Sequence, residues 1–154
     1  MKFSKSWPVT ELTVLFFAVF LSRDLLNAWL HSPHDHFGWL ALAVWLAPVL
    51  GLLKNAPAKL SANFYLLAAT IVCGLLGELT EVHFLNHIAL ALAVGAWMKF
   101  SPRIWLWLLA AVAWMPIFGW WLADFSAGMT LIFRLALALA GVAGYRLFRK
   151  QETL

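Results

Sequence analysis

Charged residues are scarce in this chain of 154 residues. Only 12% of the residues are Asp, Glu, Lys or Arg, whereas 64% are hydrophobic. Ordinary soluble domains carry about 25% charged residues. A chain with a mean hydropathy of +0.84 has too little polar surface to cover a soluble globule of its size. The composition excludes a soluble domain and predicts an integral membrane protein.

Cysteine and alternating strand patterns are also missing. Cys73 is the single cysteine, so no internal disulfide can form. Because lipid offers the backbone no hydrogen-bond partners, only helices or a closed barrel cross a membrane. The apolar runs here are long and continuous, whereas barrel strands alternate over about ten residues. We expect an all-α, polytopic helix bundle, with residues 1–154 forming one domain.

Counting about 20 residues per crossing predicts about six transmembrane helices. They are expected at residues 10–30, 38–53, 60–77, 83–98, 104–122 and 127–147, with short loops that carry Pro, Ser, Asn or charge. No small-residue cleavage site follows the first apolar run, and Arg23 and Asp24 interrupt it instead. We therefore expect the first helix to be retained in the mature protein.

Basic residues are absent from alternate loops, which predicts the orientation. If the N-terminus is cytoplasmic, every Lys and Arg except Arg23 and Arg134 lies on the cytoplasmic side. We expect a multi-pass protein of the bacterial inner membrane with both termini in the cytoplasm. The pI of about 9.6 then reflects topology, and no nucleic-acid partner is expected. The cytoplasmic set is Lys2, Lys5, Lys54, Lys59, Lys99, Arg103, Arg146, Arg149 and Lys150, and the outer acids are Asp35, Glu78, Glu81 and Asp124.

Tryptophan gives a second indication of this topology, because its amphipathic ring prefers the headgroup level. The same orientation places one set of tryptophans near the inner boundary and another near the outer boundary. The inner set is Trp7, Trp97, Trp105 and Trp107, and the outer set is Trp29, Trp39, Trp120 and Trp121.

Two arginines fall inside predicted helices. Arg23, Asn27 and His31 follow one another at i, i+4 and i+8 and share a helix face, with Asp24 beside them. A charge inside the membrane is costly unless it is paired or hydrated, so this face is expected to look into the bundle. It either fixes helix packing or serves a function. Arg134 lies about two turns into the last helix, and Asp24 or Glu78 is its expected partner.

Histidine is concentrated in the outer half of the chain. The residues that could form a site there are His31, His34, His36, His83 and His87, with the carboxylates of Glu78 and Glu81. Such a set suits a divalent late transition metal or a proton relay, and a plain polar cap on the helix ends is the alternative. Haem is disfavoured, because only His31 could face the histidines of the fourth helix.

The inner half of the chain has little polar content beyond its Lys and Arg edge. The five histidines, Cys73 and both intramembrane arginines all belong to the outer half. A transporter normally places polar groups around the membrane midplane. The asymmetry therefore disfavours a conduction path and favours a site that opens to the periplasm.

The stretches HFGWLALAVWLAPVL and PRIWLWLLAAVAWMPIFGWW, with a paired-glycine helix and a polar hairpin between them, resemble the N-terminal portion of the exosortase/archaeosortase family over residues 31–122. Members of that family are polytopic enzymes that process membrane-anchored surface proteins through Cys, Arg and His at the outer face. The family order of catalytic Cys, Arg and then His is not matched, because no histidine follows His87. No catalytic residue is carried over, and the resemblance implies a non-catalytic or accessory relative.

Three functions fit these patterns. The first is an accessory subunit in the lipid bilayer, bound to a membrane-protein partner or to further copies of itself. The second is a metal- or proton-binding protein that uses the outer His and Glu residues. The third is a periplasm-facing thiol peptidase or transpeptidase in which Arg23 or Arg134 and a histidine activate Cys73, with simple packing as the alternative role of this cysteine. The catalytic residues, if any, are not indicated.

Overall fold

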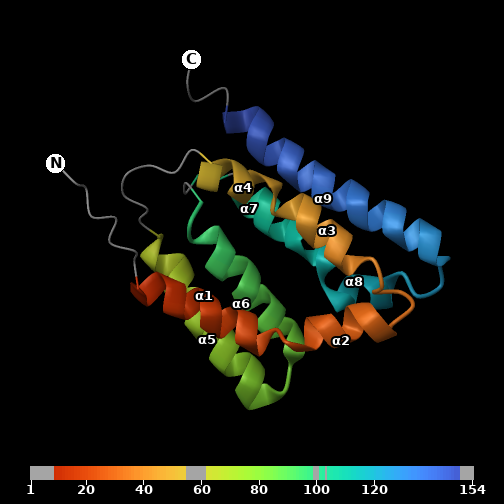
Figure 1. Cartoon of the computed structure of the whole chain (residues 1–154), viewed down its shortest axis with the longest axis horizontal. Coiled ribbons are helices and arrows are strands. Elements are labelled where there is room, and N and C mark those ends of the chain that lie inside the picture. Colours follow the sequence, from red (N-terminus) through yellow and green to blue (C-terminus); the bar gives the residue numbers. More distant parts are fainter. Residues whose placement is uncertain (1–8, 55–61, 99–100, 103, 150–154) are drawn as a thin grey trace.

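The computed structural model describes residues 9–54, 62–98, 101–102 and 104–149, and the regular structure in these ranges is helical (Figure 1). The all-α prediction is therefore confirmed. The elements in chain order are α1 (Val9–Leu21), α2 (Asp24–His31), α3 (Gly38–Trp45), α4 (Ala47–Lys54), α5 (Phe64–Thr80), α6 (His83–Gly95), α7 (Ile104–Leu109), the 3-10 helix η1 (Ala110–Trp114), α8 (Pro116–Trp121) and α9 (Ala127–Arg149).

These helices lie close to the six predicted segments, but three of the segments are broken. Among the described helices, α9 alone is long and apolar enough to cross a membrane unaided, over the 20 residues Ala127–Arg146. The first, second and fifth segments are each divided into shorter helices. Six continuous spans are therefore not confirmed, and the breaks need a physical cause.

Proline explains two of the three breaks. Pro48 lies just inside α4 and cannot donate a hydrogen bond to the carbonyl of Val44 four residues earlier, so the helix is interrupted at Leu46. Pro116 begins α8, and Met115 before it is extended with ψ of 145°, because proline disfavours the helical conformation in the preceding residue. Both breaks follow from the sequence.

The break between α1 and α2 has no proline. It falls at Ser22 and Arg23, and the Ser22 hydroxyl donates a 3.0 Å hydrogen bond to the carbonyl of Asn86 in α6. Asp24 begins α2, where a carboxylate interacts favourably with the positive end of the helix dipole. The interruption between α1 and α2 is thus accompanied by a side-chain hydrogen bond to α6 and by an acidic residue at the N-terminus of α2.

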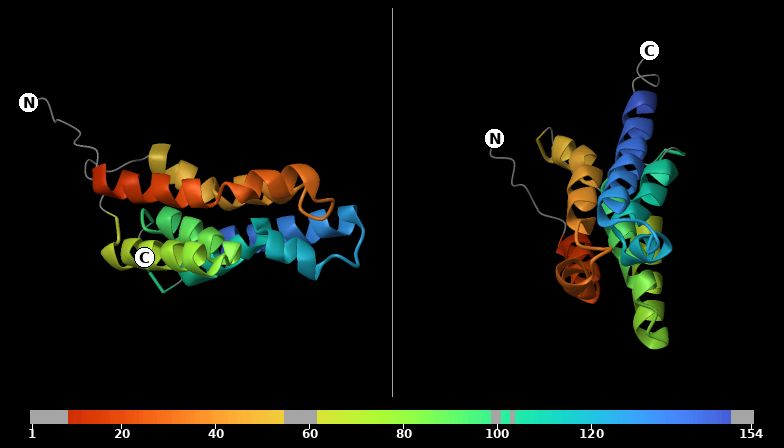
Figure 2. Two further views of the ribbon diagram at one scale, coloured as in Figure 1. Left: turned by 90° about the horizontal axis from the view of Figure 1, so that it is seen from below. Right: turned by 90° about the vertical axis from the view of Figure 1, so that its right-hand side faces the viewer.

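The helices form two groups. In the first group α6 packs on α5 and α1, and in the second α9 packs on α3, η1 and α7. α6 and α7 meet where the chain passes from the first group to the second, and α2 meets α8 at the right of Figure 1. Figure 2 shows the two groups from two further sides. The connections α2–α3 and α8–α9 lie toward the right of Figure 1, and the α5–α6 connection lies at the bottom, nearer the middle. We call the side of the bundle that carries these three connections the His-rich end. The start of α1 and the end of α9 lie toward the left.

Tryptophan forms the core of the second group. The rings of Trp45 and Trp107 are stacked with centroids 4.0 Å apart, and each indole N–H donates to the backbone carbonyl of the other residue, at 2.7 and 2.9 Å. Trp114 packs against Trp45 in an edge-on contact. All three side chains are fully buried. Reciprocal N–H bonds satisfy both indoles in an apolar interior, where an unpaired donor is costly.

The tryptophans used for the topology prediction differ in exposure. Trp107 is in the core and Trp29 is buried against η1, so both rings pack inside the bundle. Trp39, Trp105, Trp120 and Trp121 are exposed. Exposure is not membrane depth, so the boundary positions of all six stay a prediction. Several residues used for the topology prediction lie outside the described residues, namely Lys2, Lys5, Trp7, Lys59, Lys99, Arg103 and Lys150.

Candidate functional site: two buried polar joints

Arg134 is the most deeply buried charged residue of the described chain. Its side chain is fully buried in the second turn of α9, and Nη2 lies 2.5 Å from Oδ1 of Asp35 in the α2–α3 connection. Nη2 also donates to the carbonyl of His34 at 3.3 Å. The guanidinium thus ties α9 to the loop that joins the first two segments.

The same guanidinium satisfies the backbone at the break before Pro116. Nη1 donates to the carbonyl oxygens of Ala113 at 2.6 Å and Met115 at 3.3 Å. The carbonyl between them, that of Trp114, accepts a 3.2 Å hydrogen bond from the Trp29 indole. Three successive carbonyls at the end of η1 are therefore bonded by side chains from α9 and α2. We call this set of contacts the arginine joint.

The surroundings of the arginine joint are tight. A Cβ atom at Gly119 would collide with Oδ1 of Asp35 and Nη2 of Arg134, so the missing side chain makes room for the ion pair. The Phe118 ring lies 5.7 Å from the guanidinium carbon. Burial raises the pKa of the Asp35 carboxyl above its ordinary value, while the Ser32 side chain and the charge of Arg134 oppose that rise.

The predicted partners of Arg134 are wrong. Asp24 pairs with His87 and Glu78 accepts a hydrogen bond from Asn86, whereas Arg134 pairs with Asp35. The carboxylate that reaches it comes from a loop, because the α2–α3 connection folds over the end of α8 and α9. The sequence shows Asp35 as an acid in a short outer loop, but no spacing pattern connects it with Arg134, 99 residues further along the chain.

A second polar joint links α2 to α6 and α5. His87 is almost fully buried, and its Nε2 lies 2.9 Å from Oδ2 of Asp24. The neighbouring Asn86 is fully buried and donates a 2.9 Å hydrogen bond from Nδ2 to Glu78. Together with the Ser22 bond to the Asn86 carbonyl, these contacts hold the α1–α2 break against the His-rich end of α6. We call this set the histidine joint.

The predicted meeting of two polar helix faces is only partly correct. Asn86 and His87 do face inward and meet α2, as expected. Arg23, Asn27 and His31 are exposed, so this stripe points out of the bundle. The reason is that Leu25 and Trp29 occupy the inward face of α2.

The structure does not gather the predicted metal ligands. Among the described residues, no three His, Cys, Asp or Glu side chains are placed to hold a metal ion. The side chains of His31, His36, His83 and Glu81 are exposed, and His87 is engaged with Asp24. Glu81 ends α5 in a left-handed conformation with φ of 57°. This geometry does not support the predicted metal site. It also does not support a cavity lined by the histidines of both helix faces.

Cys73 is half-buried in α5. The charged partners proposed for a reactive thiol are engaged elsewhere or exposed, because Arg134 pairs with Asp35 and Arg23 points away from the bundle. The neighbouring Gly74 allows close packing instead, since a Cβ there would lie 2.8 Å from Leu21 of α1. The local geometry supports the packing role of this segment.

Comparisons with protein families, with curated proteins and with solved structures find no match. The features of the protein that bear on its function are therefore the two joints and the distribution of polar and apolar side chains.

Removing Arg134 tests the arginine joint. Arg134→Ala should lower the free energy of unfolding by roughly 3–5 kcal/mol, because it leaves Asp35 buried without its partner. Arg146→Ala is the matched control, since Arg146 is an exposed arginine of the same helix and should change stability by less than about 1 kcal/mol. The measurement is denaturant unfolding of the purified protein. Equal effects of the two substitutions would contradict the joint.

Proposed function

We propose that the chain is a multi-pass protein of the inner membrane and that it acts as a non-catalytic accessory subunit. The observation that carries the proposal is the exposure of many large apolar side chains together with the burial of several polar ones. Large apolar side chains cover the outside, with Phe16 73%, Leu79 80% and Trp120 74% exposed. The buried set includes Arg134, Asn86 and His87. An exterior of this kind is stable against lipid and unstable in water.

The broken helices fit a membrane when their halves are taken together. In each broken segment two or three short helices follow one another. At about 1.5 Å per residue the segment 9–31 is about 35 Å long, enough for a hydrocarbon core of about 30 Å. The segments 38–54 and 104–121 are about 26 and 27 Å long, which requires the bilayer to thin slightly around them. Irregular backbone at membrane depth is tolerated only where other groups satisfy it. The arginine joint supplies such groups at the Pro116 break. We therefore assign six crossings, with both termini cytoplasmic.

An accessory role follows from how the polar groups are used. Arg134, Asp35, Asp24 and His87 are each engaged in a contact that joins helices or satisfies backbone carbonyls. A catalytic role needs groups that converge on a space open to a substrate. The resemblance to the exosortase/archaeosortase family indicates the same class of role, that of a non-catalytic relative bound to a membrane partner or to itself.

The six crossings predict a definite pattern of reporter locations. Fusions after Lys54 and after the C-terminal Leu154 should report the cytoplasm, and a fusion after Asp124 should report the periplasm. The measurement is the activity of a reporter that functions on one side only. Fusions after Lys54 and Asp124 that report the same side would rule out this topology.

The accessory role predicts which substitutions a cell tolerates. In cells that lack the chromosomal gene, two variants should complement the deletion fully and give the wild-type phenotype. They are Cys73→Ala and a combined His31→Ala, His36→Ala and His83→Ala variant. Arg134→Ala should not, because the protein level falls with its stability. Immunoblots of each variant are the control. Loss of function by Cys73→Ala at a normal protein level would favour a thiol enzyme, and the same result for the histidine variant would favour a metal or proton site.

A further inference from the structure

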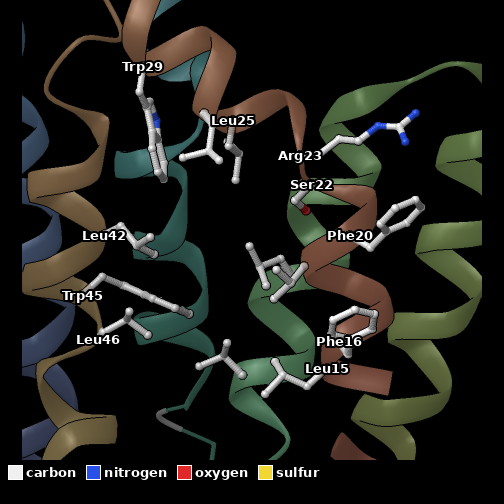
Figure 3. Close-up of a pocket in the computed structure, with 14 residues that line it drawn as sticks. Leu15, Phe16, Phe20, Ser22, Arg23, Leu25, Trp29, Leu42, Trp45 and Leu46 are labelled. Carbon is white, nitrogen blue, oxygen red and sulfur yellow. The ribbon is translucent and has the colours of Figure 1, made fainter. Parts of the chain in front are cut away.

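An apolar groove runs between the first two helical segments. One wall is α1 with α2, the other is α3, and the cavity has a volume of about 570 Å³ (Figure 3). Leu15 and Phe16 line one wall, and Leu42, Trp45 and Leu46 line the other. Leu90 and Val94 of α6 also border it. The volume falls within the range of about 300–1,000 Å³ that holds a small ligand.

The groove offers a ligand almost no hydrogen bonds. Ser22 and Arg23 are the polar residues of its lining, and the Ser22 hydroxyl already donates to the carbonyl of Asn86. The guanidinium of Arg23 is directed away from the α3 wall (Figure 3). A polar ligand would lose its hydration without compensation in such a space. Hydrocarbon suits the groove best.

Arg23 supplies a positive charge at the rim of this groove. Its side chain is exposed, its guanidinium lies 5.2 Å from the centre of the Phe20 ring, and among the described residues no carboxylate pairs with it. If the bundle is in a membrane, Arg23 lies about 12 Å below His31, at eight residues of about 1.5 Å each. A cation at that depth requires an anion or water, and the guanidinium geometry matches a phosphate.

Arg23 borders the groove partway along its α1–α2 wall. From Arg23 the groove continues along Val19 to Leu15 in one direction and along Leu26 to Trp29 in the other. On the exposed side of α2, the side chains of Asn27 and His31 continue the polar stripe that Arg23 begins. A ligand that fits both features has an anionic head and a hydrocarbon tail.

We propose that an anionic phospholipid binds here, with its phosphate on Arg23 and one acyl chain in the groove between α1–α2 and α3. The inference rests on the proposed membrane location. A phospholipid is favoured over a helix of a partner protein, because an apolar helix would fill the groove and leave Arg23 without an anion. The lipid would fill the space between the first two segments and hold them at their present separation.

Native mass spectrometry of the full chain, released from detergent micelles, tests the proposal. The probes are palmitoyl-oleoyl phosphatidylglycerol and the phosphatidylcholine with the same chains. We expect one retained phosphatidylglycerol per chain, with a preference of roughly tenfold over phosphatidylcholine. Both lipids carry the phosphate, but the choline cation of phosphatidylcholine partly neutralises it and repels the guanidinium of Arg23, an effect of roughly the size of one charged interaction. Arg23→Gln should abolish the preference, and Arg146→Gln, at an exposed arginine that does not line the groove, should retain it.

Filling the groove gives the second arm. Val94→Phe and, as an independent variant, Leu42→Phe should each reduce retention of both lipids several-fold. Val72→Phe, on the exposed face of α5, is the matched control and should bind like the wild type. Unfolding curves for each variant show whether it is folded, and Arg23→Gln tests the charge without changing the groove.

Four outcomes overturn the inference. They are equal retention of the two lipids by the wild type, an unchanged preference in Arg23→Gln, unchanged retention in the filled-groove variants, and a lipid-free dimer that the filling substitutions dissociate. The last would show that a second copy occupies the groove. If reporter fusions establish six crossings and any of these results appears, the lipid site fails alone. If the chain is not membrane-integrated, the proposed function fails as well.

Discussion

The arginine joint is the interaction on which the arrangement of the second helix group depends. Pro116 breaks the fifth segment, and the carbonyl oxygens of Ala113, Trp114 and Met115 lie at the break in an apolar interior. The Met115 carbonyl also accepts a backbone hydrogen bond from Phe118 at 3.1 Å. Unsatisfied carbonyls there would each cost a substantial free energy. Arg134 and Trp29 donate to all three, and Asp35 balances the charge of the guanidinium. One side chain thus connects α9, η1 and the α2–α3 loop.

The histidine joint plays the corresponding part in the first helix group. It joins the α1–α2 break to α6 through Asp24 and His87, and it adds α5 through Asn86 and Glu78. The two joints lie toward the same end of the bundle and concentrate its polar side chains there. Toward the other end Arg146 donates to the carbonyl of Ala47 at 3.4 Å, and the groove between α1 and α3 remains open. The chain thus combines a largely apolar interior, in which a few polar side chains are paired, with an exterior that carries large apolar side chains.

Much of the architecture could be predicted from the sequence, because apolar runs and short polar loops define segments directly. The helices near 64–80, 83–95 and 127–149 match predicted segments, and Pro48 and Pro116 indicate where two others break. The pairing of Arg134 with Asp35 could not be predicted, because the two residues are 99 positions apart in the chain. They meet only because the α2–α3 loop folds over α8 and the start of α9. The outward direction of the Arg23 stripe was missed for a related reason. Periodicity groups residues on a face, but Leu25 and Trp29 compete for the interior, and only packing decides between the faces.

A double-mutant cycle on Asp35 and Arg134 tests the central claim most directly. The free energy of unfolding would be measured in lipid for the wild type, Asp35→Asn, Arg134→Gln and the double variant. If the two residues act as one joint, the effects are not additive, and the coupling free energy is about 1.5 kcal/mol or more. Effects that add to within about 0.5 kcal/mol would show that the two side chains contribute independently and would contradict the account.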